Sequence, residues 1–299
     1  MISIFKKRPL IVTHNGNFHA DDVLAVAALH LLLGGRYKLV RTRDPQIIAK
    51  GTYVVDVGGE DDPVRQKFDH HQKGGAGARP NSIPYAAFGL VWKEYGSVLC
   101  GSDQVAAEID DKIVAASDAM DNGIEIMKRI YPDIFPYQFV HFLSSFNPSW
   151  NEKQDFDGHF QKALSYAITM LKREIDRENS NLEGKKHAEE AYQKAEDKRI
   201  VELGGPYPWR SVLIGHEEPL FVIRKEEESG NWAARAVPVE EGSFECRRTF
   251  PAAWAGLRDE ALSKATGIAD SVFCHNKLFL AVAKSRESAI ALAKKALEG

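Results

Sequence analysis

The chain has few cysteines, no long apolar run and no excess of basic residues, and each absence excludes a class of protein. Its three cysteines, Cys100, Cys246 and Cys274, form no Cys-x-x-Cys pair, which argues against a disulfide framework and a thiolate zinc site. No stretch reaches the roughly 18 consecutive apolar residues that a membrane span needs, so no membrane association is expected. The sparse cysteines favour a reducing compartment, and we expect a cytoplasmic protein.

Neither sign of charge dominates the 299 residues. Lys and Arg number 39 and Asp and Glu number 42, giving a net charge of −3. This balance does not suggest a protein that coats nucleic acid by bulk charge, although it leaves a local basic groove open. Residues 1–9 include Lys6, Lys7 and Arg8 with no apolar segment after them, so no secretory signal is expected.

Short β-branched runs alternate with helical segments in the first third of the chain. Strands are predicted over 10–13, 37–41 and 53–57, with a helix from Asp21 or Asp22 to Gly34 and a short helix over 45–50 between them. This order predicts a parallel sheet flanked by helices. Further helices are predicted over 82–95 and 103–119. The segment 157–202 indicates two long helices with a break near Gly184.

A second domain is predicted after Gly204-Gly205-Pro206, the best linker candidate. Beyond this linker, strands are predicted over 211–214, 220–223, 232–237, 272–275 and 278–283, followed by a helix over 286–297. The expected fold is therefore α/β. We expect a domain at 1–203 with the parallel sheet flanked by helices, and a second, smaller α+β C-terminal domain at 207–299.

Four polar clusters lie where a site at the sheet edge would need them. Ligands of open α/β sheets bind outside the carboxyl ends of the strands. Two clusters follow predicted strands directly, and two follow apolar segments that could bring them to the same edge. The candidate side chains are His14, His19, Asp21, Asp56, Asp69, His70, His71, Asp118 and Asp121.

Imidazoles and carboxylates without thiolates suit Mn²⁺, Mg²⁺, Fe²⁺ or Zn²⁺. The groups suffice for two metals, and a pair about 3.5–4 Å apart can clamp both the attacking and the leaving oxygen of a phosphoryl transfer. Such a pair needs an anionic bridge, and Asp56 at a strand end is well placed to be one.

Structural alternatives exist for each cluster. Asp21 could only cap its helix, and Asp118 and Asp121 could simply close one. If His70 and His71 lie in a strand, their side chains point to opposite faces, and only one of them reaches a given metal. The other histidine would then support the site or face a substrate.

Long motifs occupy five segments of this chain: 13–22, 54–59, 68–72, 118–123 and 248–257. These motifs resemble those of the melanocyte proliferating gene family, a branch of the DHH phosphoesterase superfamily of metal-dependent hydrolases and exonucleases. A histidine stands where the wider superfamily has an aspartate in the first motif, a spacing that fits this branch. The resemblance covers nearly the whole chain.

This resemblance implies a DHH-like metal-binding catalytic domain and a substrate-binding C-terminal domain. In such a site Asp56 would bridge the metals, Asp69 would orient His70, and His71 would face the scissile phosphate, with His71 and Asp69 as the catalytic pair. The implied metal ligands are His14, His19, Asp21, Asp56, His70 and Asp118. The substrate contacts expected in the second domain are Arg235, Arg248, Gly256, His275 and Arg286.

The resemblance implies a metal-dependent phosphodiester hydrolase, most specifically a 3′-to-5′ exonuclease acting on RNA or a short oligonucleotide. We expect Mn²⁺ as the divalent metal, with Mg²⁺, Fe²⁺ and Zn²⁺ as alternatives. Two other functions stay open: a small-molecule phosphatase or pyrophosphatase on the same site, and a non-enzymatic, metal-stabilised binding protein. A homodimer also stays open.

Overall fold

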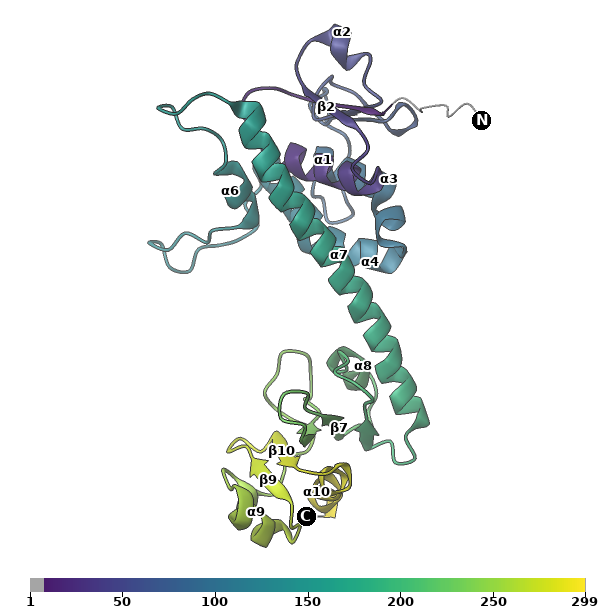
Figure 1. Ribbon diagram of the computed structural model, residues 1–299, viewed down its shortest axis with the longest axis vertical. Helices are drawn as coiled ribbons and strands as arrows, with labels where there is room; N and C mark the ends of the chain where they lie inside the picture. Colours follow the sequence, from purple (N-terminus) through teal and green to yellow (C-terminus); the bar gives the residue numbers. More distant parts are fainter. Residues whose placement is uncertain (1–7, 299) are drawn as a thin grey trace, which may run out of the picture. The chain divides into compact units, whose positions relative to one another are not determined.

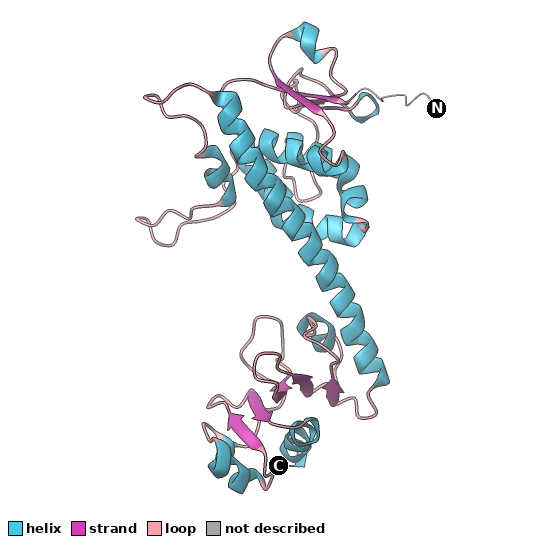
Figure 2. Ribbon diagram, in the orientation of Figure 1, coloured by secondary structure: helices cyan, strands magenta, loops and turns pink. Residues whose placement is uncertain are grey.

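The computed structural model describes residues 8–298, and the chain in it divides into two compact units, one ending at Asn179 and the other beginning at Ser180. Each unit contains its own sheet, drawn in magenta in Figure 2. Residues 1–7, on which the expectation about a secretory signal bears, lie outside the described residues. No helix in the described part of the chain combines the length and apolar character needed to cross a membrane.

The first unit is built on a mixed five-stranded sheet of order β2-β1-β3-β5-β4. Four of its strands run parallel, and β4 runs antiparallel beside β5. The predicted α/β fold with a parallel sheet is thus confirmed, with one antiparallel edge strand added. The strands are β1 (Leu10–Thr13), β2 (Lys38–Arg41), β3 (Tyr53–Val55), β4 (Asp61–Asp62) and β5 (Lys67–Phe68).

Helices cover this sheet, and the most deeply buried of them is α1. All residues from Ala20 to Leu29 are buried, so α1 is a core helix rather than an amphipathic surface helix. A π-helical segment, Asp110–Val114, joins α4 to α5, so the helix predicted over 103–119 is present with a wider turn in its middle. The helices are α1 (Ala20–Leu32), α2 (Pro45–Ile48), α3 (Ala87–Cys100), α4 (Asp103–Ile109), α5 (Ala115–Asp121) and α6 (Phe139–Ser144).

The second unit has a five-stranded sheet of order β6-β7-β8-β10-β9, in which only β6 and β7 pair in parallel. The segment 211–214, predicted as a strand, is instead the helix α8 (Arg210–Ile214), because a four-residue apolar run does not distinguish the two. The other elements are β6 (Ile200–Glu202), β7 (Phe221–Lys225), β8 (Trp232–Ala236), β9 (Ser271–Cys274), β10 (Leu280–Ala283), α9 (Asp259–Thr266) and α10 (Arg286–Glu298).

The helix α7 (Phe156–Lys194) is continuous, so the prediction of two helices with a break near Gly184 is wrong. A side chain at Gly184 would place a Cβ 2.5 Å from Cδ of Pro208, so this glycine allows a close approach inside the second unit. The last turns of α7 also bury Ala188 and Tyr192 in the core of the second unit. The boundary between units therefore lies within α7, upstream of the linker expected at 204–206.

Candidate metal centre

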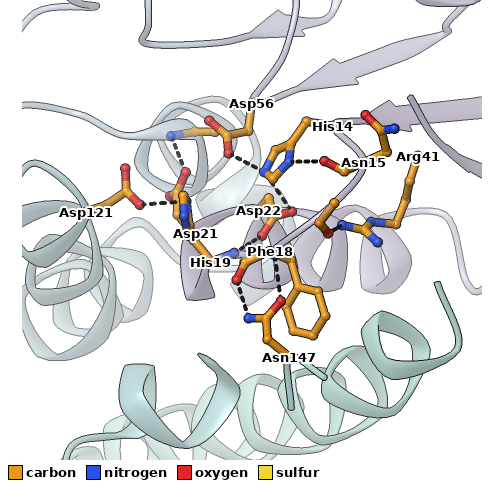
Figure 3. A network of polar contacts seen from close by, with 12 residues as sticks. His14, Asn15, Phe18, His19, Asp21, Asp22, Arg41, Asp56, Asp121 and Asn147 are labelled. Atoms are coloured by element: carbon orange, nitrogen blue, oxygen red, sulfur yellow. Dashed lines mark hydrogen bonds and ion pairs between the residues drawn. The ribbon is translucent and has the colours of Figure 1, made fainter. Parts of the chain in front are cut away.

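The loop between β1 and α1 delivers the first imidazole. His14 is buried directly after β1, and its Nδ1 donates to the backbone carbonyl of Asn15 at 3.2 Å. This hydrogen bond leaves Nε2 as the ring nitrogen with a free lone pair. Nε2 lies 3.2 Å from Oδ2 of Asp22 and 3.2 Å from Oδ2 of Asp56, and Figure 3 shows His14 between these two carboxylates.

Asp56 occupies the centre of the site, directly after β3. Its backbone is left-handed, with φ of +54°, a conformation uncommon outside glycine. Its Oδ2 faces His14, while its Oδ1 lies 3.4 Å from Nε2 of His70 and 3.4 Å from Nδ1 of His71. One buried carboxylate therefore faces histidines on two sides, which is the arrangement that a bridging ligand needs.

Two adjacent aspartates at the start of α1 have different tasks. Asp22 caps α1, since its Oδ1 accepts the backbone N–H of His19 at 2.9 Å. Asp21 instead accepts the backbone N–H groups of Ala87 and Phe88, at 3.0 and 2.8 Å, where α3 begins. The capping role considered for Asp21 is thus directed at another helix.

His70 and His71 both reach Asp56, contrary to the alternation expected of a strand. The reason is that β5 ends at Phe68, so the two histidines follow in an irregular segment where strand geometry does not apply. Their ring centroids lie 4.3 Å apart. Nε2 of His70 also lies 3.2 Å from Oδ2 of Asp121.

The resemblance implied that Asp69 orients His70, but in the structure Asp69 contacts His71 instead. Oδ1 of Asp69 lies 2.8 Å from Nδ1 of His71 and accepts the His71 backbone N–H at 3.1 Å. Oδ2 of Asp69 accepts the backbone N–H of Gly59 at 2.5 Å. Asp69 is buried, whereas the His71 side chain is 60% exposed. A carboxylate at Nδ1 fixes the ring and leaves Nε2 available to a ligand.

The structure places Asp118 outside the cluster and Asp121 inside it. Asp118 is fully buried, and its two oxygens accept from Nη1 of Arg79 at 2.6 Å and from the backbone N–H of Gly89 at 3.0 Å. Asp121, one turn later on α5, faces both His70 and His19, whose Nδ1 lies 3.7 Å from Oδ1 of Asp121. The geometry therefore favours Asp121 over Asp118 as a metal ligand.

Proton affinities in the cluster reflect crowded, buried carboxylates. Burial raises the pKa of Asp22 to about 7, and burial together with neighbouring aspartates raises that of Asp21 well above its usual range. Burial also opposes ionisation of Asp56, yet His14 and His70 hold the pKa of Asp56 below its usual value. Burial alone would lower the pKa of His70, but Asp121 and Asp56 raise it to about 10. The crowded carboxylates therefore favour positive charge at the centre, from a protonated histidine or from a cation.

The donor atoms fit a divalent cation. Three of them are buried without a hydrogen-bond partner: Oδ2 of Asp22, Oδ1 of Asp56 and Nε2 of His70. Buried polar atoms rarely stay unpaired, and a cation would satisfy all three. The donor atoms form three sets, and within each set the atoms lie within 4.8 Å of one another. Shared residues join the sets into one centre. The sets are His14, His19 and Asp56; Asp56, His70 and His71; and Asp21, His70 and Asp121.

A pocket of about 500 Å³ opens beside this centre. Arg43, which the sequence analysis did not single out, contributes a guanidinium to its lining. The available signal was its position, two residues after β2 and so at the same edge of the sheet as His14 and Asp56. The pocket is lined by His14, Asn15, Gly16, Asn17, His19, Arg43, Asp56, Val57, Gly58, Gly59, Asp69 and His71.

Two of the cationic residues expected to bind substrate in the second unit, Arg235 and Arg286, line different pockets. Arg235 pairs with Glu226 at 3.0 Å and lines a pocket of about 460 Å³. Arg286 pairs with Glu202 and lines another, of about 610 Å³. Nε of Arg248 donates to the carbonyl of Ala296 at 2.9 Å, near the end of α10.

The two other residues expected in the substrate site form local turns. Nδ1 of His275 accepts the backbone N–H of Lys277 at 3.0 Å, and the ring lies 4.4 Å from that of Phe279. Gly256 donates its N–H to the carbonyl of Cys274 at 3.1 Å. The partners in these contacts all belong to the second unit.

Comparisons with known proteins agree with the resemblance stated from the motifs. The model of a family labelled MYG1 exonuclease, and described as Uncharacterised protein family (UPF0160), matches residues 10–297. A human protein named MYG1 exonuclease is 34% identical, covering 97% of this chain and 86% of its own length. A MYG1 protein of Schizosaccharomyces pombe is 33% identical, covering 96% and 97%, and one of Chlamydia pneumoniae is 31% identical, covering 93% of each.

Among solved structures, an exopolyphosphatase-related protein from Bacteroides fragilis aligns over 97% of this chain and 92% of its own. Its TM-score of 0.25 and identity of 10% are too low to bear on fold or function. The family match rests instead on the sequence relatives and on the model that spans both units. The chain belongs, over nearly its whole length, to the MYG1 family.

Proposed function

We propose that this chain is a metal-dependent phosphodiester hydrolase that removes nucleotides in the 3′-to-5′ direction from RNA or short oligonucleotides in the cytoplasm. The relatives named MYG1 exonuclease support a nuclease. The observation that carries the proposal is Asp56, whose two oxygens face His14 on one side and the His70-His71 pair on the other. A buried carboxylate placed in this way suits the bridge of a two-metal phosphoryl-transfer site.

The donor groups divide around Asp56 into two ligand sets. His14, Asp22 and His19 would hold one cation, with Mn²⁺ as the first candidate. Asp21, His70 and Asp121 would hold the second, while Asp118 would keep α5 in place rather than bind metal. When bound, the cations would polarise the phosphoryl oxygens and lower the pKa of the attacking water. Their charge would also neutralise the crowded carboxylates.

His71 is the residue of this set best placed to act on the substrate. Asp69 accepts from Nδ1 of His71, so Nε2 would donate a hydrogen bond to an oxygen of the scissile phosphate when the ring carries both protons. Its side chain is exposed in a pocket of about 500 Å³, a size that suits a nucleotide. His71 and Asp69 would thus stabilise the charge that develops on the phosphate oxygens.

The substitution Asp56→Asn tests this proposal, since an amide keeps the shape of the side chain but cannot supply the bridging charge. We expect bound metal to fall and cleavage of a short RNA labelled at its 3′ end to drop by about 10³-fold. Asp111→Asn, which changes an exposed carboxylate on the same unit, serves as the matched control. Undiminished cleavage by Asp56→Asn would exclude the mechanism.

The same assay separates the other functions that the sequence leaves open. A phosphatase or pyrophosphatase would turn over pyrophosphate or a nucleoside bisphosphate faster than a dinucleotide. A binding protein would lose stability on metal removal and cleave none of these compounds. An RNA labelled at its 5′ end shows the polarity, because 3′-to-5′ digestion produces a ladder of shortening labelled products.

A further inference from the structure

Arg43 is a cation of the metal-centre pocket that the proposed ligand sets do not use. Its side chain is exposed, and among residues 8–298 no carboxylate lies within ion-pair distance of its guanidinium. An exposed arginine without a partner is usually only solvated. Arg43 differs because its side chain is held in place against the centre.

Asn15 holds the guanidinium. Nη1 of Arg43 donates to the Asn15 backbone carbonyl and, at 3.1 Å, to Oδ1 of the Asn15 side chain. The same carbonyl accepts from Nδ1 of His14 at 3.2 Å, and Figure 3 shows Asn15 beside His14. One peptide oxygen thus links Arg43 to a candidate metal ligand. The remaining N–H groups of Arg43, on Nε and Nη2, make no hydrogen bond with the described residues.

Sheet order gives the direction in which Arg43 extends the site. The strands run β2-β1-β3-β5, and the functional side chains follow them in that order: Arg43, His14, Asp56, then the Asp69–His71 pair. Arg43 and His71 therefore stand at opposite ends of the row. Neighbouring strands lie about 4.8 Å apart, so Arg43 leaves the sheet two strand spacings, about 10 Å, from Asp56. Arg43 thus lies beyond the point where the scissile phosphate would sit, on the side away from His71.

A guanidinium with free N–H groups suits the phosphate groups of a nucleic acid, because its planar fork can donate two parallel hydrogen bonds to one phosphate. We propose that Arg43 binds the phosphodiester next to the scissile one. The pocket would then recognise two consecutive phosphodiesters of a strand rather than one. This inference rests on the proposed hydrolysis of phosphodiesters at the metal centre.

The test compares three substrates of the full-length chain loaded with Mn²⁺. They are a dinucleotide, a trinucleotide, and a trinucleotide whose linkage next to the scissile one is a neutral methylphosphonate. For the wild type, we expect KM to rise about tenfold when the second phosphodiester is absent or neutral. Arg43→Gln should show the raised KM on the trinucleotide, with no further change on the other substrates. Arg43→Lys should recover part of the loss, since an ammonium keeps the charge without the fork.

Arg36→Gln is the matched control, because Arg36 is exposed and precedes β2 at the opposite edge of the sheet. Metal content and melting temperature should match the wild type in both variants. Binding of a fluorescent trinucleotide in the presence of Ca²⁺ gives a readout independent of turnover, and Arg43→Gln should weaken it about tenfold. Equal losses by Arg43→Gln on the dinucleotide and the trinucleotide would overturn the inference. Failure of the wild type to cleave any of the substrates would instead overturn the proposed function.

Discussion

Single residues at this centre combine structural and chemical tasks, which limits what sequence alone can predict. His14, Asp56 and His70 could be predicted because each follows an element that leads to the carboxyl edge of the sheet. The sequence could not show whether Asp118 or Asp121 lies in the cluster, since both lie on α5 and differ only in the direction they face. Arg79, a partner distant in sequence, binds Asp118 and so decides between them.

Asp69→Asn is expected to lower kcat by about 100-fold, because the amide no longer fixes His71 with Nδ1 protonated. Metal content should stay near the wild-type value, since the two oxygens of Asp69 are held by His71 and by the backbone N–H of Gly59. Measuring kcat together with metal content by elemental analysis checks both parts. A loss of metal equal to the loss of activity would show that Asp69 acts on the metal centre and not through His71.

Among the helices, the start of α3 connects three elements. The first N–H groups of any helix lack partners within it, and here the N-cap residue, Ala86, has no side chain that could serve them. Asp21 from α1 and Asp118 from α5 accept these N–H groups instead. This shared capping fixes α5 against α1, and so determines where Asp121 meets His70.

Gly89 is the point of closest approach in this arrangement. A Cβ at Gly89 would lie 1.8 Å from Oδ2 of Asp118, so Gly89→Ala should destabilise the chain by about 1–3 kcal/mol. Urea unfolding of the single variants and of the double variant with Asp118→Ala provides the measurement. Because Asp118→Ala removes the clashing atoms, the double variant should lose less unfolding free energy than the two single variants lose together. Strict additivity would place the cost of Gly89→Ala elsewhere.

Secondary structure could be predicted wherever a segment was long or bounded by clear signals. The strands β1, β2 and β3 and the helix α1 follow from apolar runs that end in polar or glycine residues. The two-residue strands β4 and β5 contain no such run and were not predicted. The continuity of α7 and the helical form of α8 could not be predicted, because both depend on packing around Pro208 and Trp209. Short apolar runs and an isolated glycine are ambiguous without those partners.

For the molecule as a whole, all proposed metal ligands lie in the first of its two units. They fall between His14 and Asp121, well before the boundary at Asn179. A fragment ending at Asn179 should therefore bind the same number of metal ions as the full chain, and added Mn²⁺ should raise its melting temperature. Elemental analysis and thermal denaturation with and without a chelator check this. A fragment that folds but binds no metal would show that the second unit supplies a ligand.

The left-handed backbone at Asp56 determines which replacements there can be interpreted. Asparagine tolerates this conformation nearly as well as aspartate, whereas alanine would add conformational strain of about 1 kcal/mol to the loss of the carboxylate. Glycine would relieve the strain but remove every side-chain contact. Only the amide replacement removes the charge while keeping both the side-chain shape and the main-chain geometry. The difference in stability and activity between the asparagine and alanine variants therefore measures what the shape and backbone conformation of Asp56 contribute, apart from its charge.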